Sequence, residues 1–249
     1  MDHLELIRIE PRQILDVGCR TGQSLDLLAR RFPKARLLAL ELSAAMLKRA
    51  RGGWLTRRRR PCLPLCASLE HLPLNAASVD LVHSNLALAW TNSPDQTLAE
   101  CRRILMPGGL LVFSTLGPDT LKELRRAPTS GARQTTNVHP FLDMHDVGDA
   151  LVRAGYADVV MDAEVLDISY RHLDALHAEL RSLGATNVLD ARPRTLSGRG
   201  YKACLEQRLG NRDGKAHVSI EVIYGHAWSL AETPATKFSP RSIAPITVR

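Results

Sequence analysis

Ile14-Leu15-Asp16-Val17-Gly18-Cys19-Arg20-Thr21-Gly22 is the stretch that decides the fold, and an apolar run at residues 36–40 follows it and ends in Glu41. An apolar strand that enters a glycine-bearing turn, then a helix, then a second strand ending in a carboxylate, is typical of a nucleotide-type site. Glycines let the backbone approach a ligand, and the start of a helix offers free N–H groups. The carboxylate at the strand tip is placed to accept both hydroxyls of a ribose. The sequence therefore predicts a ribose-bearing ligand here.

Predicted strands and helices alternate along most of the chain. Strands are expected at residues 13–17, 36–41, 62–67, 79–84 and 110–114, and helices at 23–31, 43–50 and 93–105, with a turn at 107–109. Later residues predict helices at 119–126, 144–154 and 173–183 and strands at 159–170 and 218–224. This alternation predicts an α/β fold with a parallel sheet that helices cover on both faces.

The length and the composition of the chain limit the classes of protein to which it can belong. With 249 residues and 45% hydrophobic content, we expect one domain over residues 1–230 and a disordered tail over 231–249. The sequence has neither a signal peptide nor an apolar run near the roughly 20 residues of a membrane span, so we expect no membrane contact. Five cysteines without a C-x-x-C pair predict no metal site and a cytoplasmic protein. The net charge of +7 suits an acidic protein partner as well as nucleic acid.

Several segments resemble known methyltransferases. The order Asp16, Gly18, Gly22 is similar to the D-x-G-x-G-x-G loop of class I S-adenosylmethionine (SAM) methyltransferases, with Arg20 where the middle glycine belongs. More specific are residues 113–125 (FSTLGPDTLKELR), 141–151 (FLDMHDVGDAL), 183–187 (LGATN) and 221–228 (EVIYGHAW). Over nearly the whole chain these resemble the malonyl-acyl-carrier-protein O-methyltransferase family of biotin synthesis.

The resemblance implies a fold and an activity. The fold is the Rossmann-like class I methyltransferase fold, a mostly parallel seven-stranded sheet with an antiparallel last strand. The cofactor is SAM, and the reaction is methylation of the free carboxylate of a malonyl thioester on acyl carrier protein, or on malonyl-CoA, early in biotin (pimeloyl) synthesis. That carboxylate is ionised at neutral pH, so the resemblance implies alignment of the reactants rather than acid–base catalysis.

The resemblance also assigns cofactor-binding residues: Asp16, Gly18, Gly22, Glu41, Ser68, Leu69, Ser84 and Asn85. Asp16 and the two glycines shape the loop, and Glu41 accepts the ribose hydroxyls. Ser68 stands where the family has an acid that contacts adenine. The residues at 84 and 85 flank the methyl-bearing sulfur. Close packing is an alternative role for Gly22, and strand-end capping is an alternative for residues 84 and 85.

Three residues are candidates for positioning the acyl substrate. Lys122 and Arg125 follow the strand at 110–114, and a guanidinium matches a carboxylate in bidentate geometry. Arg125 is therefore the candidate for holding the malonyl group, although a solvated helix face explains both residues equally well. Trp90 is expected to line the pocket, with a core role as the alternative.

Two other functions compete with this interpretation. Arg20, Ser68 and the short segment before residue 13, which lacks the family's lid helices, favour a catalytically weak or inactive relative. A sister family, the complex I assembly factor, shares the D-T-L-x-E-L-R segment, whereas Y-G-H-A-W at 224–228 points to the biotin family. A nucleic-acid methyltransferase is not expected, because residues 84–87 (SNLA) do not form an N-P-P-Y motif and no Pro-Cys nucleophile occurs.

Overall fold

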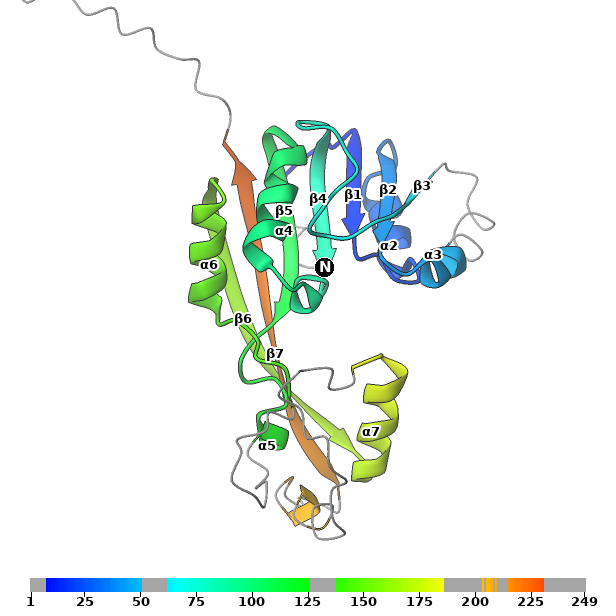
Figure 1. Cartoon of the computed structure of the whole chain (residues 1–249), viewed down its shortest axis with the longest axis vertical. Helices are drawn as coiled ribbons and strands as arrows, with labels where there is room; N and C mark the ends of the chain where they lie inside the picture. Colours follow the sequence, from blue (N-terminus) through cyan, green and yellow to red (C-terminus); the bar gives the residue numbers. More distant parts are fainter. Residues whose placement is uncertain are drawn as a thin grey trace, which may run out of the picture.

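The computed structural model describes residues 8–50, 62–125, 138–185, 203, 205–207, 209 and 215–230. Seven strands of this part of the chain form one sheet in the order β3-β2-β1-β4-β5-β7-β6 (Figure 1). The strands are β1 (Gln13–Val17), β2 (Arg36–Glu41), β3 (Cys62–Cys66), β4 (Val79–Asn85), β5 (Leu105–Leu116), β6 (Tyr156–Tyr170) and β7 (Ala216–Ser229). The helices are α2 (Gln23–Arg31), α3 (Ala44–Ala50), α4 (Pro94–Ile104), α5 (Lys122–Arg125), α6 (Met144–Arg153), α7 (Leu173–Ser182) and the 3₁₀ helix η2 (Leu88–Trp90).

The sheet is mostly parallel. Strands β1 to β5 pair in parallel, and β7 pairs antiparallel with both β5 and β6. Helices α2 and α3 cover one face, where Leu25 and Leu28 are buried, and α4 and α6 cover the other, where Leu98 and Leu151 are buried. The sequence prediction of a class I methyltransferase sheet with an antiparallel last strand is confirmed.

The carboxyl ends of β1, β2, β4 and β5 meet at one edge of the sheet, the lower edge in Figure 1. The segments 18–22, 42–43 and 86–93 begin there, because each follows one of these strands. Ligands of open α/β sheets bind in the crevice outside these strand ends. The topology therefore brings the sequence-predicted loop, Glu41 and the end of β4 to one edge.

A smaller lobe extends beyond this edge (Figure 1). Residues 165–170 of β6 pair with 216–221 of β7 beyond the last pair that β7 makes with β5. Helices α5 and α7 pack on this two-stranded ribbon, and we call the ribbon and its helices the distal lobe. Its buried cluster is separate from those of the sheet and contains Leu124, Val138, Leu173, Leu176, Leu205, Leu209 and Val218.

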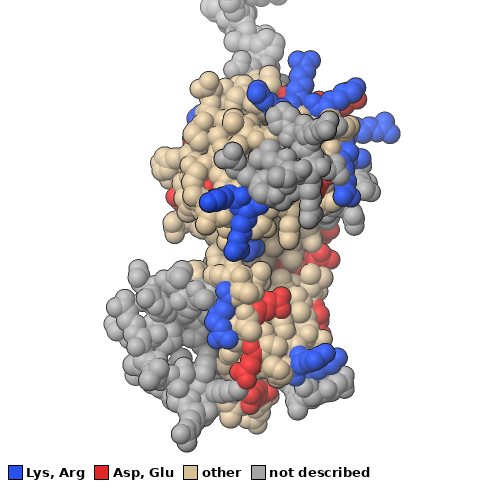
Figure 2. All heavy atoms as spheres, turned by 90° about the vertical axis from the view of Figure 1, so that its right-hand side faces the viewer, with Lys and Arg blue, Asp and Glu red and all other residues tan. Residues whose placement is uncertain are grey.

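Charge is distributed unevenly over the molecule. On the face drawn in Figure 2, Lys and Arg side chains predominate over the sheet, whereas both signs occur on the distal lobe. Among the described residues, no helix is long and apolar enough to span a membrane.

Two strand predictions were incomplete. The turn predicted at 107–109 lies inside β5 as a bulge, since Val79 pairs with Leu105 whereas Leu81 pairs with Leu110. Gly108, with φ 74°, provides the backbone conformation that this bulge needs. The strand predicted at 218–224 continues to Ser229, because its second half pairs with β5. The predicted tail at 231–249 lies outside the described residues, and a single domain over 1–230 stays a prediction.

Candidate active site

The glycine loop is fixed against the end of β2. The N–H groups of Gly18 and Cys19 both donate to the carbonyl oxygen of Leu40, at 2.8 and 3.0 Å. Gly18 has φ 71°, and a Cβ there would lie 2.4 Å from the Cβ of Ala87, so a larger residue would force the loop to move. Gly22, with φ 84°, precedes the first residue of α2, and a Cβ there would press on α3.

Asp16 lies behind the loop and is 2% exposed. Its Oδ1 is 2.8 Å from His83 Nδ1, and its Oδ2 accepts a hydrogen bond from the hydroxyl of Ser24 in the first turn of α2. The carboxylate therefore joins β1, β4 and α2 beneath the loop. Sequence reasoning missed His83, because its contact depends on the pairing of β1 with β4, which places residues 16 and 83 opposite each other.

Glu41 is buried at the tip of β2, with 8% of its surface exposed. Its Oε2 accepts the backbone N–H of Arg20 at 3.0 Å, and its Oε1 accepts that of Ser43 at 2.9 Å. A carboxylate has about four acceptor positions, so roughly two remain for other donors. The geometry fits a ribose diol, which offers two hydroxyl donors.

Cys19 lies within this loop. Burial, followed by the charges of Asp16 and Glu41, raises the pKa of its thiol well above the ordinary value. The thiol therefore stays protonated at neutral pH, and a protonated thiol is a poor nucleophile.

The segment after β3 is organised by Glu70. Its carboxylate accepts hydrogen bonds from Thr91 Oγ1 at 3.0 Å and from the N–H of Asn92 at 2.9 Å, and these donors lower its pKa. Glu70 is thus engaged in holding the segment before α4. Ser68 accepts the N–H of Glu70 at 3.3 Å, and Leu69 packs against the sheet. The assignment of Ser68 and Leu69 to the adenine stays a prediction.

The two predicted residues at the end of β4 differ in their surroundings. Ser84 is buried, and its Oγ has no hydrogen-bond partner within the described part of the chain. Asn85 is exposed and accepts a hydrogen bond from Ser114 Oγ at 2.7 Å. Asn85 therefore joins β4 to β5, as the capping alternative requires, whereas the hydroxyl of Ser84 is a buried group with an unused hydrogen-bonding position.

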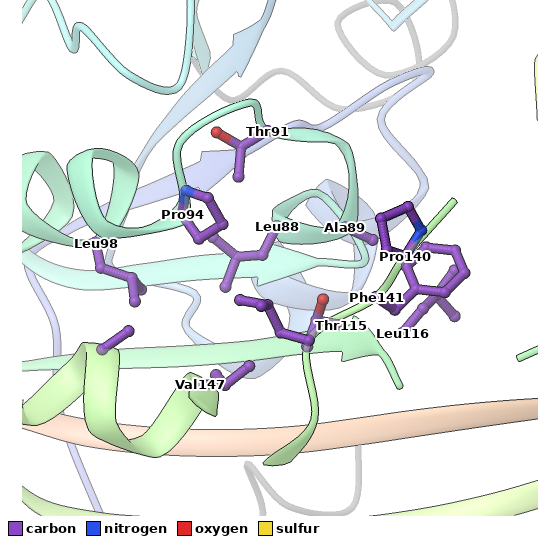
Figure 3. A pocket seen from close by; sticks show the side chains of 12 residues that line it. Leu88, Ala89, Thr91, Pro94, Leu98, Thr115, Leu116, Pro140, Phe141 and Val147 are labelled. Carbon is purple, nitrogen blue, oxygen red and sulfur yellow. The ribbon is translucent and has the colours of Figure 1, made fainter. Parts of the chain in front are cut away.

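An apolar pocket lies beside the ends of β4 and β5 (Figure 3). Its walls come from η2, the start of α4, the end of β5, residues 140–142 and α6, and they include Leu88, Thr115 and Phe141. Trp90 does not line this pocket, contrary to the sequence prediction. It is 52% exposed and packs beside His139, because the short η2 helix directs residues 88 and 89 inward and residue 90 outward.

Arg125 joins α5 to the wall of this pocket. Its Nη1 donates to the carbonyl oxygen of Pro118 at 2.6 Å and its Nη2 to that of His139 at 3.0 Å, while the guanidinium lies over the ring of Phe141. Burial lowers the pKa of the Arg125 guanidinium. Within the described residues, Arg125 Nε and His139 Nε2 are buried without a partner. Two unpaired nitrogen atoms therefore lie beside an apolar pocket.

Lys122 precedes Arg125 on the same short helix. Its Nζ donates to Asp119 Oδ2 at 2.8 Å, and about a third of its side chain is exposed. Lys122 and Arg125, which the sequence analysis treats together, therefore differ in their contacts. Lys122 is ion-paired with Asp119, whereas Arg125 donates to two backbone carbonyls. Sequence reasoning did not place His139 and Phe141 beside Arg125, because they approach it only through the tertiary fold.

Comparison with known proteins agrees with this geometry. A family profile described as a methyltransferase domain matches residues 15–113. The crystal structure of the YcgJ protein of Bacillus subtilis has a TM-score of 0.64 and covers 88% of this chain and 92% of that chain at 12% identity, which shows the fold alone. The fold and the site define a class I SAM-dependent methyltransferase.

Two curated relatives show to which family the chain belongs. The malonyl-[acyl-carrier protein] O-methyltransferase of Laribacter hongkongensis is 45% identical over 94% of this chain and 81% of its own length. The protein of that name from Methylovorus sp. is 41% identical over 100% of this chain and 85% of its own length. The chain belongs to the malonyl-[acyl-carrier protein] O-methyltransferase family, and the resemblance found in the sequence is confirmed.

Proposed function

We propose that this protein transfers the methyl group of SAM to the free carboxylate of a malonyl group carried by acyl carrier protein. Family membership over nearly the whole chain is the observation that carries the proposal. It supports an active enzyme over an inactive assembly protein. Malonyl-CoA presents the same acyl group and is the second acceptor to test, and we place the reaction in the cytoplasm.

The chemistry requires positioning more than proton transfer. When bound, SAM supplies an electrophilic methyl group on a sulfonium sulfur. The malonyl carboxylate is ionised at neutral pH, so its oxygen forms the new O–CH₃ bond as the C–S bond breaks, without a general base. The work of the chain is to align the reactants and to exclude water. The protonated thiol of Cys19 does not compete for the methyl group.

Residues at the carboxyl ends of β1, β2 and β4 would hold SAM in this proposal. Glu41 accepts the ribose hydroxyls, while Gly18 and Gly22 let the loop approach the ligand. Asp16 holds the loop from behind through His83 and Ser24. Ser84 Oγ is the buried group with an open hydrogen-bonding position at the end of β4. Ser68 offers a hydroxyl to the adenine, and Leu69 and Asn85 complete the wall.

Arg125 holds the malonyl carboxylate in this proposal. Two backbone carbonyls fix its guanidinium, and a guanidinium has five N–H groups, so three remain for a carboxylate. The unpartnered Nε and the neighbouring His139 Nε2 support a polar ligand at this position, beside an apolar pocket for the rest of the acyl group. Lys122 lies on the same helix and Trp90 beside His139, and both act in the approach of the carrier.

Mass spectrometry of malonyl-loaded carrier protein, incubated with SAM and the full chain, tests the proposal. We expect the carrier to gain one methyl group, with a methyl ester that alkaline hydrolysis removes. Arg125→Ala is expected to bind SAM normally and to form the ester at least tenfold more slowly, because a charge-assisted contact to the carboxylate is lost. SAM binding without a methyl ester on either malonyl-carrier protein or malonyl-CoA would instead favour the inactive relative.

A further inference from the structure

Arg20 occupies a costly backbone position in the cofactor loop. Its φ is 51°, in the left-handed region that residues with a Cβ adopt only at a cost in free energy. The sequence nevertheless carries arginine where the loops it resembles carry glycine. Its backbone N–H donates to Glu41, so the position belongs to the cofactor site itself. The side chain, however, is exposed and makes a contact outside the loop.

That contact is with the distal lobe. Arg20 Nη2 donates to the carbonyl oxygen of Leu183 at 3.5 Å, across 163 residues of sequence. Leu183 follows the last residue of α7 and is followed by Gly184, whose φ of 73° ends the helix. The guanidinium therefore joins the cofactor loop, at the edge of the sheet, to the carboxyl end of a helix in the other half of the molecule.

The carboxyl end of α7 suits a cation. The last carbonyl groups of a helix lack partners within the helix and carry the negative end of its dipole. A positive guanidinium at this end is held by charge as well as by the hydrogen bond. Because the backbone of Arg20 is bonded to Glu41 and its side chain to Leu183, this residue joins the proposed cofactor site to the distal lobe.

We propose that Arg20 is a positioning residue that latches the cofactor loop to α7 and slows the departure of SAM and of its demethylated product, S-adenosylhomocysteine. The latch rests on the proposed function only in that SAM is the ligand of this loop. It assigns a role to the residue that departs from the methyltransferase loop pattern.

Dissociation rates of SAM and S-adenosylhomocysteine from the full chain test the latch. Arg20→Ala keeps the left-handed backbone and removes the side chain, so we expect both ligands to dissociate roughly two- to tenfold faster, as for one lost hydrogen bond. Arg20→Lys keeps a cation near the end of α7 and should fall closer to the wild type. Arg20→Gly removes the contact and the strain together and should also dissociate faster than the wild type.

Arg36→Ala is the matched control, because Arg36 is an exposed arginine at the opposite end of β2. The dissociation rates and the thermal midpoint of Arg36→Ala should equal those of the wild type. The latch would be overturned if Arg20→Ala left the dissociation rates unchanged or if Arg20→Gly slowed dissociation. Either result would mean that the side-chain contact does not hold the ligand. The acyl acceptor is absent from these assays, so a failure of methyl transfer to malonyl-carrier protein leaves their outcome intact. A wild-type chain that binds no SAM would overturn both proposals.

Discussion

The central sheet is covered by helices on both faces, whereas the distal lobe packs two helices on a two-stranded ribbon. Leu15 of β1 and Leu81 of β4, in the interior of the sheet, are 0% exposed and belong to the two large clusters on its faces. In the ribbon of the distal lobe, by contrast, residues 165–170 of β6 are all partly or fully exposed. The sheet therefore gains most of its stability from apolar burial, whereas the described residues of the distal lobe form one small buried cluster.

Polar contacts carry a larger share in the distal lobe. Glu123 accepts hydrogen bonds from the hydroxyl of Ser219 at 2.7 Å and from its N–H at 3.1 Å, which joins α5 to β7. Glu221 accepts the N–H of Asp119 at 2.7 Å, and Gly117 leaves room for its side chain. Regions with few buried apolar contacts open at lower free energy than the core. The comparison indicates that the sheet is the more rigid part of the described structure and that the distal lobe opens more easily.

The largest expected effect is at the centre of the sheet. Leu81→Ala leaves a cavity where both faces are packed, so we expect the free energy of unfolding to fall by about 2–5 kcal/mol. Urea denaturation measures this change. Leu63→Ala on β3 is the control, because its side chain is 49% exposed and little burial is lost. Equal losses in the two variants would contradict the assignment of stability to the interior of the sheet.

A matched deletion in the distal lobe sharpens the comparison. Leu176 on α7 is 1% exposed, and Leu176→Ala should destabilise the lobe locally by about 2–3 kcal/mol, since the small cluster can partly collapse. We expect faster amide exchange in α7 and β6 and slower methyl transfer, with SAM dissociation faster by no more than the change expected for Arg20→Ala. If amide exchange rises equally in β1 and β4, the two halves unfold as one unit and the comparison fails.

The next effect concerns the cofactor. Glu41→Ala removes the acceptor proposed for the ribose, and charge-assisted hydrogen bonds contribute on the order of 1.5–3 kcal/mol, so SAM binding should weaken roughly tenfold or more. Titration calorimetry measures the affinity. Glu41→Gln keeps the shape and one acceptor oxygen, and we expect an intermediate affinity. Wild-type affinity in Glu41→Ala would refute the assignment of the ribose to this residue.

Local patterns predicted single helices and strands well in both parts of the molecule, and they predicted features that depend on strand pairing poorly. The bounds of β1, α2 and β2 agree with the prediction, because apolar runs punctuated by glycine determine them locally. The bulge in β5 and the full length of β7 depend on partner strands, which the sequence does not display. The same holds for the site: Glu41 stands at a strand tip as predicted, whereas the contacts of His83 and Arg125 join segments far apart in sequence. The roles of the site residues stay predictions.

The smallest expected effect is electrostatic and concerns the encounter with the carrier. Lys122 lies on α5 in the distal lobe, whereas Lys34 is exposed in the turn before β2, at the opposite edge of the sheet. Lys122→Glu and Lys34→Glu change the net charge equally. Comparing them therefore separates an effect of charge at α5 from an effect of the net charge of the whole chain. Because Lys122 is paired with Asp119 and partly exposed, its contribution is modest. We expect Lys122→Glu to raise KM for malonyl-carrier protein roughly two- to fivefold with kcat unchanged, and Lys34→Glu to change neither.

Ionic strength supplies the control for this last prediction. Raising the salt concentration should increase KM of the wild type towards that of Lys122→Glu, since screening removes the same attraction. Malonyl-CoA presents no acidic protein surface, so its KM should depend less on salt and on residue 122. Equal salt dependence with both acceptors would mean that the carrier's protein surface does not take part. Recognition would then depend on the malonyl group alone, through Arg125 and the apolar pocket beside the ends of β4 and β5, and the basic charge of the chain would have no role in the encounter.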